Sequence, residues 1–571
     1  MRIAARSVLL VAGVFLLAAL KPEPGWSQLE AGSRPNILLI VADDLGYQDL
    51  SVFGGEIETP NIDSLAASGL VFTNFHVLVA CQPTRAMLLS GTDHHVAGVG
   101  SQGRVIEGNL AYQNRLTERV ASIAERMQGL GYHTYMAGKW HLGEQPGQTP
   151  HDRGFERSFV LLQPGAFHFD KISYGANVPV TYQDDGVEVE SLPEDFYSTI
   201  TYTDRMIEYI DEAAASDRPF FGYLAYTAPH WPIQALDEDM ARVRGRYDEG
   251  YDVIRERRFQ RLKELGYIPA DAPAPRLPAG YKAWDELTPE RQALEIAVME
   301  AYAAMVERLD MEIGRVLRHL EEIGELDDTL VLFMSDNGAE GTADDGPFMA
   351  DYRSRFDNSV ENTGRRNSYR LIGLGWGTAG AAGDFLTKGS LAQGGIHAPL
   401  IVSAPALGVK PGRNDALTAA LDLGPTFVEL AGGRNDTVVG GREVMPMTGR
   451  SLAPILRGEA DATRGPDDVF ALEHGGQRAV FRGDWKALWI APPNGIGGWQ
   501  LFDLAEDPGE TTDLAAEHPD VMAELAAAYE RYAEEVGVVP PGPRPGAGPG
   551  PGAAPGPGRG PGSRPAPASA N

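Results

Sequence analysis

The strongest constraint on the fold is a recurring run of apolar residues that stops abruptly at polar ones. Residues 36–42 form one such run and residues 329–335 form another. An unbroken apolar run of this length is typical of a central parallel strand that is covered on both faces. The side chains that follow the two runs are Asp43, Asp44, Asp336 and Asn337. We therefore expect these four polar side chains at the ends of buried strands.

Helical patterns separate the strand-like runs, which recur at 220–226 and 400–403. The clearest helix signal is the cap residue Thr288, followed by Pro289 at the first helical position, and its pattern continues to about Gly324. This alternation predicts an α/β fold with a large mixed, mostly parallel sheet sandwiched by helices. Ligands of such folds bind at the carboxyl ends of the strands, where we expect the functional site.

The chain changes character near residue 466. Short aromatic runs at 478–481, 485–490 and 499–502 are separated by Gly, Asp or Pro, and a helical pattern follows at about 519–536. These patterns predict a small antiparallel sheet and a helix. Residues 539–571 are nearly all Pro, Gly, Ala and Arg, which predicts a disordered tail. We therefore expect a catalytic domain over 34–465 and a C-terminal subdomain over 466–538.

The first 33 residues have the pattern of a secretory signal peptide and leader. Arg2 and Arg6 precede an uninterrupted apolar stretch over residues 8–20, which Lys21 ends. No later run approaches the roughly 20 apolar residues that a membrane-spanning helix needs. We therefore expect a secreted protein, periplasmic or extracellular in a bacterium, with no stable association with the membrane.

The net charge of the chain limits the classes of ligand that it can bind. The formal net charge is −30, and the two terminal segments, which are net positive, do not cause it. A field of this sign disfavours binding to nucleic acid and to polyanions such as heavily sulfated polysaccharides. We expect a small, singly charged substrate and a monomeric protein.

The four polar residues at the strand ends suit a hard cation, which prefers oxygen ligands. One Asp-Asp pair alone would be typical of a solvated turn. Two pairs on matching strand ends favour a metal site, because carboxylates that converge without a cation repel one another.

Cys81 is the only cysteine of the chain. A lone cysteine in an exported protein cannot form an intramolecular disulfide, so it is either buried and inert or used chemically. It lies in the sequence Cys81-Gln82-Pro83-Thr84-Arg85, which an apolar turn and Ser90-Gly91 follow. This motif resembles the signature of the formylglycine-dependent, or type I, sulfatases of the alkaline phosphatase superfamily.

Further segments resemble the same family, and in particular the bacterial arylsulfatases. They are the two metal segments Val41 to Gly46 and Met334 to Gly338, the Lys-x-His segment Gly138 to Gly143, and the His segment Ala228 to Pro232. The resemblance spans roughly residues 34–538 and includes the two-domain layout.

The resemblance implies hydrolysis of a sulfate monoester, and the likeness to arylsulfatases implies that the substrate is an aryl sulfate, which yields a phenol and inorganic sulfate. It implies one Ca²⁺ and the conversion of Cys81 to 3-oxoalanine (formylglycine) by a formylglycine-generating enzyme that binds only transiently. The metal ligands that it implies are Asp43, Asp44, Asp336, Asn337 and residue 81. The hydrated aldehyde carries two hydroxyls on one carbon: one attacks sulfur, and the other releases sulfate by regenerating the aldehyde.

The resemblance also implies roles for the remaining residues. Arg85 holds the hydrate, and Lys139 binds the ester oxygens. Asp336 takes or orients the proton of the nucleophile. His230 and Lys388 protonate the leaving group and contact the substrate, and His141 removes the proton of the second hydroxyl.

Some residues depart from the family pattern. Thr84 occupies a position where serine is commonest, and His397 occupies one where relatives usually have arginine. Lys388 is assigned only by its spacing to Gly394 and Gly395. We expect Glu340 and Asp384 to be ordinary surface acids.

Two other functions stay open on the sequence. A phosphate or phosphonate ester hydrolase could use the same scaffold, since the same cations would stabilise a phosphoryl transition state. A catalytically silent binding protein with an unmodified thiol is the second alternative.

Overall fold

The computed structural model describes residues 34–176, 178–344 and 349–541. Its centre is a ten-stranded sheet in the order β11-β2-β10-β9-β1-β8-β4-β5-β6-β7. The strands are β1 (Asn36–Ala42), β2 (Leu70–Phe72), β4 (His133–Lys139), β5 (Arg157–Leu161), β6 (Tyr182–Asp184), β7 (Val187–Glu188), β8 (Phe220–Ala225), β9 (Thr329–Ser335), β10 (Leu400–Ser403) and β11 (Gly412–Asn414). The five strands β9, β1, β8, β4 and β5 run parallel, whereas β10 and β6 are antiparallel to their neighbours.

Strand β1 lies in the middle of the sheet because both of its faces are apolar. Leu38 and Ile40 pack into one core layer, and Leu39 and Val41 pack into the other. Its pairing with β9 runs through seven residues and ends at Ala42 opposite Ser335. The two strands therefore finish side by side, as the matching polar ends of their sequences predict.

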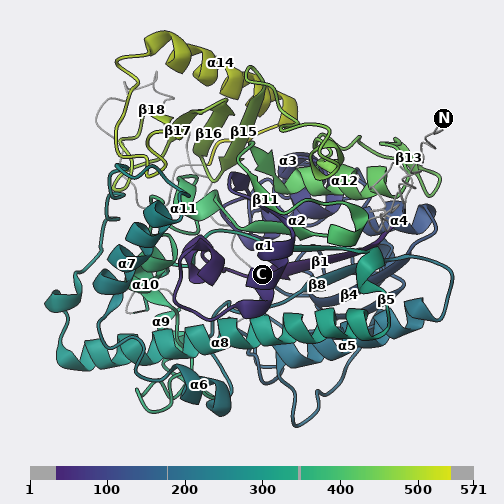
Figure 1. The fold of residues 1–571 in the computed structure, drawn as a ribbon, viewed down its shortest axis with the longest axis horizontal. Coiled ribbons are helices and arrows are strands. Elements are labelled where there is room, and N and C mark those ends of the chain that lie inside the picture. The colour runs from purple at the N-terminus through teal and green to yellow at the C-terminus, as the bar shows by residue number, and fades with distance from the viewer. Residues whose placement is uncertain (1–33, 177, 345–348, 542–571) are drawn as a thin grey trace, which may run out of the picture.

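Helices cover both faces of the sheet, which confirms the predicted fold class (Figure 1). One face carries α1 (Pro60–Ser68), α5 (Ser198–Ala214) and α8 (Pro289–Glu322), and the other carries α2 (Cys81–Ser90), α4 (Ile123–Gly129) and α12 (Leu423–Leu430). Helix α8 begins where the sequence predicts, because the Thr288 side chain accepts a hydrogen bond from the Arg291 backbone N–H at 3.3 Å.

A second, four-stranded antiparallel sheet lies beside the large one and carries α14 (Pro519–Val536) (Figure 1). Its strands are β15 (Val469–His474), β16 (Gln477–Arg482), β17 (Trp485–Trp489) and β18 (Trp499–Asp503). Three of these strands match the predicted aromatic runs, and β15 was not predicted. Lys486 on β17 forms a buried ion pair with Glu510 at 2.7 Å and donates to the Leu391 carbonyl at 2.8 Å, which attaches this sheet to the large one.

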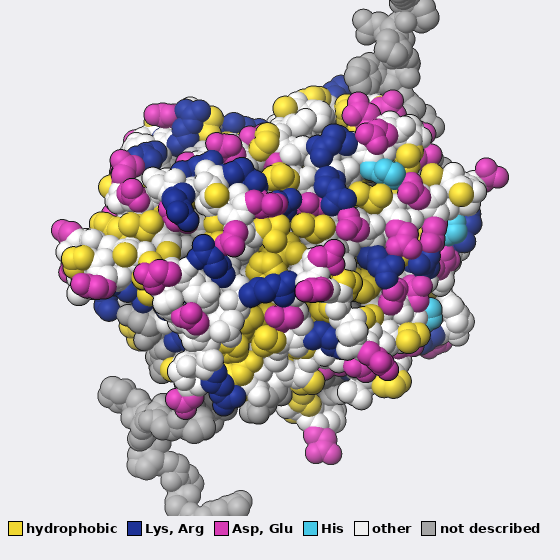
Figure 2. Space-filling view, turned by 90° about the horizontal axis from the view of Figure 1, so that it is seen from below, with side chains coloured by type: hydrophobic (Ala, Val, Ile, Leu, Met, Phe, Trp, Pro, Cys, Tyr) yellow, Lys and Arg dark blue, Asp and Glu magenta, His cyan; other side chains and the backbone are white. Residues whose placement is uncertain are grey.

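The remaining α-helices of the described residues lie in the segments that connect these layers. They are α3 (His94–Ala97), α6 (Asp237–Val243), α7 (Tyr251–Glu264), α9 (Ala350–Arg353), α10 (Gly373–Gly380), α11 (Gln393–Ile396) and α13 (Ala453–Leu456). Acidic and basic side chains are interspersed on the face shown in Figure 2, so the negative net charge is not gathered into one patch there.

The predicted signal segment 1–33 lies outside the described residues, as does the predicted tail from residue 542. The described end of the chain is held in place: Arg104 donates to the carbonyls of Val539 and Pro540 at 2.9 and 3.2 Å. Within the described residues, no helix is both long and apolar enough to cross a membrane.

Candidate active site

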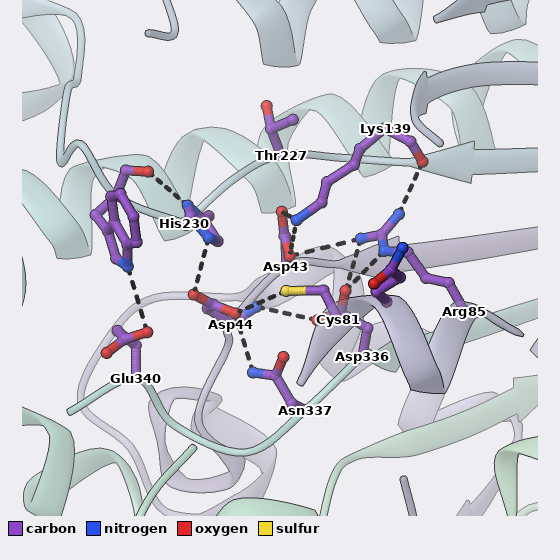
Figure 3. A network of polar contacts seen from close by, with 12 residues as sticks. Asp43, Asp44, Cys81, Arg85, Lys139, Thr227, His230, Asp336, Asn337 and Glu340 are labelled. Atoms are coloured by element: carbon purple, nitrogen blue, oxygen red, sulfur yellow. Dashed lines mark hydrogen bonds and ion pairs between the residues drawn. The ribbon is translucent and has the colours of Figure 1, made fainter. Parts of the chain in front are cut away.

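The polar residues predicted at the strand ends do meet at one edge of the sheet (Figure 3). Asp43 and Asp44 follow β1, and Asp336 follows β9 directly. Backbone hydrogen bonds fix these turns, since the Asp336 N–H donates to the Ala42 carbonyl at 3.1 Å and the Asp44 N–H donates to Asp336 Oδ1 at 3.3 Å. The carboxylates are therefore positioned by the backbone of two paired strands.

Lys139 reaches the same edge because it is the last residue of β4. Gly138 precedes it with a φ of +119°, and a Cβ at this position would lie 1.8 Å from the Ala225 carbonyl oxygen of β8. Only glycine allows the two strands to approach this closely. The close approach brings the Lys139 ammonium within 2.7 Å of Asp43 Oδ2.

Cys81 lies within this cluster at the start of α2. Its side chain is 2% exposed, and its Sγ lies 3.6 Å from Asp44 Oδ1 and 3.5 Å from Lys388 Nζ. Burial, followed by the charges of Asp336 and Asp43, raises the pKa of the Cys81 thiol well above its ordinary value. The encoded side chain is therefore a neutral thiol rather than an activated thiolate.

Arg85 lies one helical turn after Cys81 and so faces the same way. Its Nε and Nη2 atoms bind Asp336 Oδ2 at 2.8 and 2.7 Å, and its Nη1 donates to the Lys139 carbonyl at 2.8 Å. The guanidinium is fully buried and links α2 to the ends of β9 and β4. This rigid fork fixes where residue 81 lies relative to the carboxylates.

The charges in the cluster balance in number. Three carboxylates (Asp43, Asp44, Asp336) face three cations (Arg85, Lys139, Lys388). Lys388 binds both oxygens of Asp44 at 2.5 and 2.7 Å, as Lys139 binds both oxygens of Asp43. A divalent cation would leave a net positive charge, which favours an anionic ester group.

The residues present fit such a cation. One ligand atom from each of Asp43, Asp44, Cys81 and Asp336 lies within 4.8 Å of the others. Asn337 adds an amide oxygen, Oδ1, that is buried and has no hydrogen-bond partner. Because buried polar atoms are almost always paired, this oxygen is suited to an electropositive partner such as a cation. The oxygen ligands of this set, three carboxylates and one amide, are typical of Ca²⁺, whereas the Cys81 sulfur would suit a softer metal.

The pKa values of the acids differ within the cluster. Burial and the neighbouring Asp43 raise the pKa of Asp336 to about 6, although Arg85 and Lys139 oppose this. Burial alone would also raise the pKa of Asp44, but Lys388 and other cationic neighbours hold it well below its ordinary value. Asp336 therefore holds a proton more readily than Asp44 does.

The two predicted histidines lie at the same edge, and both are neutral. Burial and the charges of Lys139 and Arg85 lower the pKa of His141 well below its ordinary value, and its Nδ1 is buried without a partner. Burial also lowers the pKa of His230 to about 3, although Asp44 opposes the shift. His230 Nδ1–H donates to the Trp231 carbonyl at 2.5 Å, so Nε2, which lies 3.5 Å from Asp44, carries the lone pair.

The expectation that Glu340 and Asp384 are surface acids is wrong. Glu340 is 5% exposed and Asp384 is 8% exposed. Asp384 pairs with His397 at 3.0 Å, and Glu340 Oε2 lies 3.4 Å from Lys388 Nζ. Both acids lie in segments without regular structure, so no periodic pattern in the sequence reveals their burial.

The sequence and the fold of the chain were compared with those of known proteins. The sequence matches the family described as Sulfatase over residues 35–433. It is 42% identical to an uncharacterized sulfatase of Schizosaccharomyces pombe, over 89% of this chain and 94% of the relative. It is 40% identical to an arylsulfatase of Klebsiella aerogenes, over 74% and 92%. The crystal structure of Ps i-CgsB in complex with k-i-k-neocarrahexaose has a TM-score of 0.62 and 26% identity, and the match covers 88% of this chain and 93% of that one.

Proposed function

The chain belongs to the sulfatase family, and we propose that this sulfuric ester hydrolase acts on aryl sulfates through an aldehyde hydrate derived from Cys81. The observation that carries the proposal is the position of residue 81. It lies within hydrogen-bonding distance of Asp44 and Lys388, inside a buried cluster of three carboxylates and three cations. An inert core cysteine would lie among apolar side chains instead.

We further propose that Asp43, Asp44, Asp336, Asn337 and residue 81 hold one Ca²⁺. A bound Ca²⁺ would polarise the ester oxygens and stabilise the negative charge that develops on them. The unpartnered Oδ1 of Asn337 supports this assignment.

The positions of the side chains in the site support different catalytic roles for them. Asp336 has a carboxylate oxygen within 4.8 Å of Cys81 Sγ, so it is placed to take or orient the proton of the attacking hydroxyl on residue 81. Lys139 and Arg85 present fixed positive charge on the side of β4 and α2, where the sulfuryl oxygens bind. Both cations are buried and held by the ends of secondary-structure elements, so their charge is in place before the ester binds.

Lys388 and His230 are the proposed handlers of the leaving group, and their protonation states differ. Burial lowers the pKa of Lys388, but the charge of Asp44 outweighs this effect and raises the pKa well above its ordinary value, so Lys388 is protonated. His230 is neutral and presents an acceptor at Nε2. We therefore assign proton donation to Lys388 and contact with the substrate to His230.

A matched pair of substrates tests the reaction class. We expect a higher kcat/KM for 4-nitrophenyl sulfate than for 4-nitrophenyl phosphate, measured on the same preparation with Ca²⁺ present. A higher kcat/KM for the phosphate would instead support a phosphate ester hydrolase on this scaffold. Turnover of neither ester would favour a binding protein, and a sulfated sugar as the only substrate would overturn the aryl assignment.

His141→Ala is expected to separate the two halves of the reaction. His141 is neutral and has an unpartnered Nδ1, so it can remove the proton of the second hydroxyl on residue 81. Without it, phenol release should show a burst of one equivalent per active site and then slow by roughly 10²- to 10⁴-fold. Stopped-flow detection of the phenol measures both phases.

The matched control for this experiment is His319→Ala, since His319 lies on α8 and pairs with Asp211 at 2.7 Å. This variant should keep the steady-state rate of the wild-type protein. Steady turnover by His141→Ala at that same rate would refute the role of His141.

The other proposals concern the setting of the enzyme. We propose that the chain is exported, that it works as a monomer and that its only protein partner at the site is the modifying enzyme. The domain bounds 34–465 and 466–538 remain predictions.

A further inference from the structure

Glu340 is a buried carboxylate beside the site to which the reaction proposed above gives no role. Its Oε1 accepts hydrogen bonds from the backbone N–H groups of Gly341 and Thr342 at 2.9 and 2.5 Å. Its Oε2 lies 3.3 Å from the indole Nε1 of Trp231 and 3.4 Å from Lys388 Nζ (Figure 3 shows the contact with the indole). One oxygen therefore fixes the acid to its own loop, and the other is aimed at two neighbours.

The backbone around Glu340 is packed directly against the backbone that carries Lys388. The Lys388 N–H donates to the Ala339 carbonyl at 2.9 Å. A Cβ at Gly341 would lie only 2.4 Å from Thr387 Oγ1, so the two segments meet with no space between them. The distance between the Glu340 carboxylate and the Lys388 ammonium is thus set by main-chain packing.

Among the described residues, Lys388 forms ion pairs with two acids, Asp44 and Glu340. Asp44 is also a proposed ligand of the cation, and an oxygen that binds a divalent ion is a weaker partner for an ammonium group. Glu340 is outside the group of residues that could hold the ion. It is the acid that can keep Lys388 in place when the oxygens of Asp44 are engaged elsewhere.

We propose that Glu340 is a positioning residue that holds the Lys388 ammonium at the leaving oxygen of the ester; this inference rests on the proposed function. As the S–O bond breaks, its electron pair stays on the leaving oxygen. Lys388 Nζ gives that oxygen a proton and becomes a neutral amine, which solvent reprotonates. The contact of Glu340 with Trp231 fixes the indole beside His230, whose ring centroid lies 4.6 Å from that of Trp231.

A series of aryl sulfates that differ in the pKa of the released phenol tests this inference. Proton donation matters most for poor leaving groups, so Glu340→Gln should lower kcat for phenyl sulfate by roughly 10- to 100-fold. It should change kcat for 4-nitrophenyl sulfate by less than about threefold, since a good leaving group needs little help from an acid. Glutamine is nearly isosteric, and its one amide oxygen can still accept from the Gly341 and Thr342 N–H groups. Its amide nitrogen then faces Lys388 and the Trp231 N–H, so the contact with the indole is lost together with the charge.

A double-mutant cycle shows whether Glu340 acts through Lys388. The variant with both Glu340→Gln and Lys388→Ala should be no slower on phenyl sulfate than Lys388→Ala alone. Glu340→Asp, which keeps the charge, should recover part of the loss. Additive losses, or an equal loss across the whole substrate series, would overturn the inference and leave Glu340 a structural residue.

Two controls separate the alternatives. Glu144→Gln removes an exposed acid that accepts from Gln163, and it should leave the leaving-group dependence unchanged. Calorimetric titration of Glu340→Gln with Ca²⁺ should give the same Ca²⁺ affinity as the wild-type protein. A lower Ca²⁺ affinity would make Glu340 a metal ligand instead. Failure of the wild-type protein, with residue 81 oxidised to the aldehyde, to hydrolyse any aryl sulfate would refute the proposed function, independently of the outcome for Glu340.

Discussion

Cys81→Ala is expected to lower the turnover rate of an aryl sulfate by about 10⁴-fold or more, which is the loss of rate typical when an enzyme loses its nucleophile. The reason is that no other side chain of the site can supply two hydroxyls on one carbon. Folding should persist, because the sulfur contributes only contacts at 3.5 and 3.6 Å and no covalent link. Initial rates together with the thermal midpoint Tm measure the two effects.

The control for this variant lies on the same helix. Ser90 is at the far end of α2, where its hydroxyl donates to the Ala86 carbonyl at 2.6 Å. Ser90→Ala should keep the turnover rate within a few-fold of that of the wild-type protein. If Cys81→Ala retained substantial activity, residue 81 would not be the nucleophile.

Removal of divalent ions should cost at least about 10²-fold in kcat, because a bound metal ion is worth several kcal/mol of charge stabilisation. Ca²⁺ should restore the rate, and Tm should rise with Ca²⁺ concentration, as expected for a ligand that binds only the folded state. Asn337→Ala should weaken this response, since it removes the unpartnered Oδ1. Activity after treatment with EGTA and the Ca²⁺-dependent shift in Tm measure these effects.

A matched control distinguishes the metal site from the general acidity of the chain. Asp327 is an exposed acid near the other end of β9 from Asp336. Asp327→Asn should leave the Ca²⁺ response unchanged. Full activity in a chelated, metal-free preparation would contradict the proposed role of the ion.

The part of the site that sequence could predict is the part that local chain geometry determines. Asp43, Asp44 and Asp336 follow apolar runs, and a run that ends in acids already indicates the carboxyl end of a buried strand. Arg85 is four residues after Cys81, so helical periodicity alone brings both to one face. These relations need no knowledge of how distant segments pack.

The part that sequence could not predict depends on tertiary packing. Glu340 looks like a loop acid until the segment that carries Lys388 packs against it, and the pairing of Asp384 with His397 depends on the same kind of contact. Strand β15 (Val469–His474) was not predicted, and it contains the buried acid Glu473. Glu473 pairs with His95 at 3.0 Å, a contact between residues far apart in the sequence that exists only in the folded chain.

The sequence resemblance supplied a different kind of information. It assigned Lys388 from spacing alone, and the structure brings its ammonium within 3.5 Å of Cys81 Sγ. Periodicity and composition could not have selected this lysine, because an isolated lysine in a loop is a solvated cation by default. The protonation states of His141 and His230 likewise follow from burial and neighbouring charge, which only the folded chain provides.

The central claim is that residue 81 of the working enzyme is an aldehyde rather than a thiol. Mass spectrometry of the peptide that contains residue 81, isolated from active enzyme made in its natural host, tests this claim most directly. We expect the mass of a peptide in which CHO replaces CH₂SH, together with the mass of its hydrate. The same peptide should react with hydrazides. An intact cysteine that alkylates fully in an active preparation would contradict the central claim.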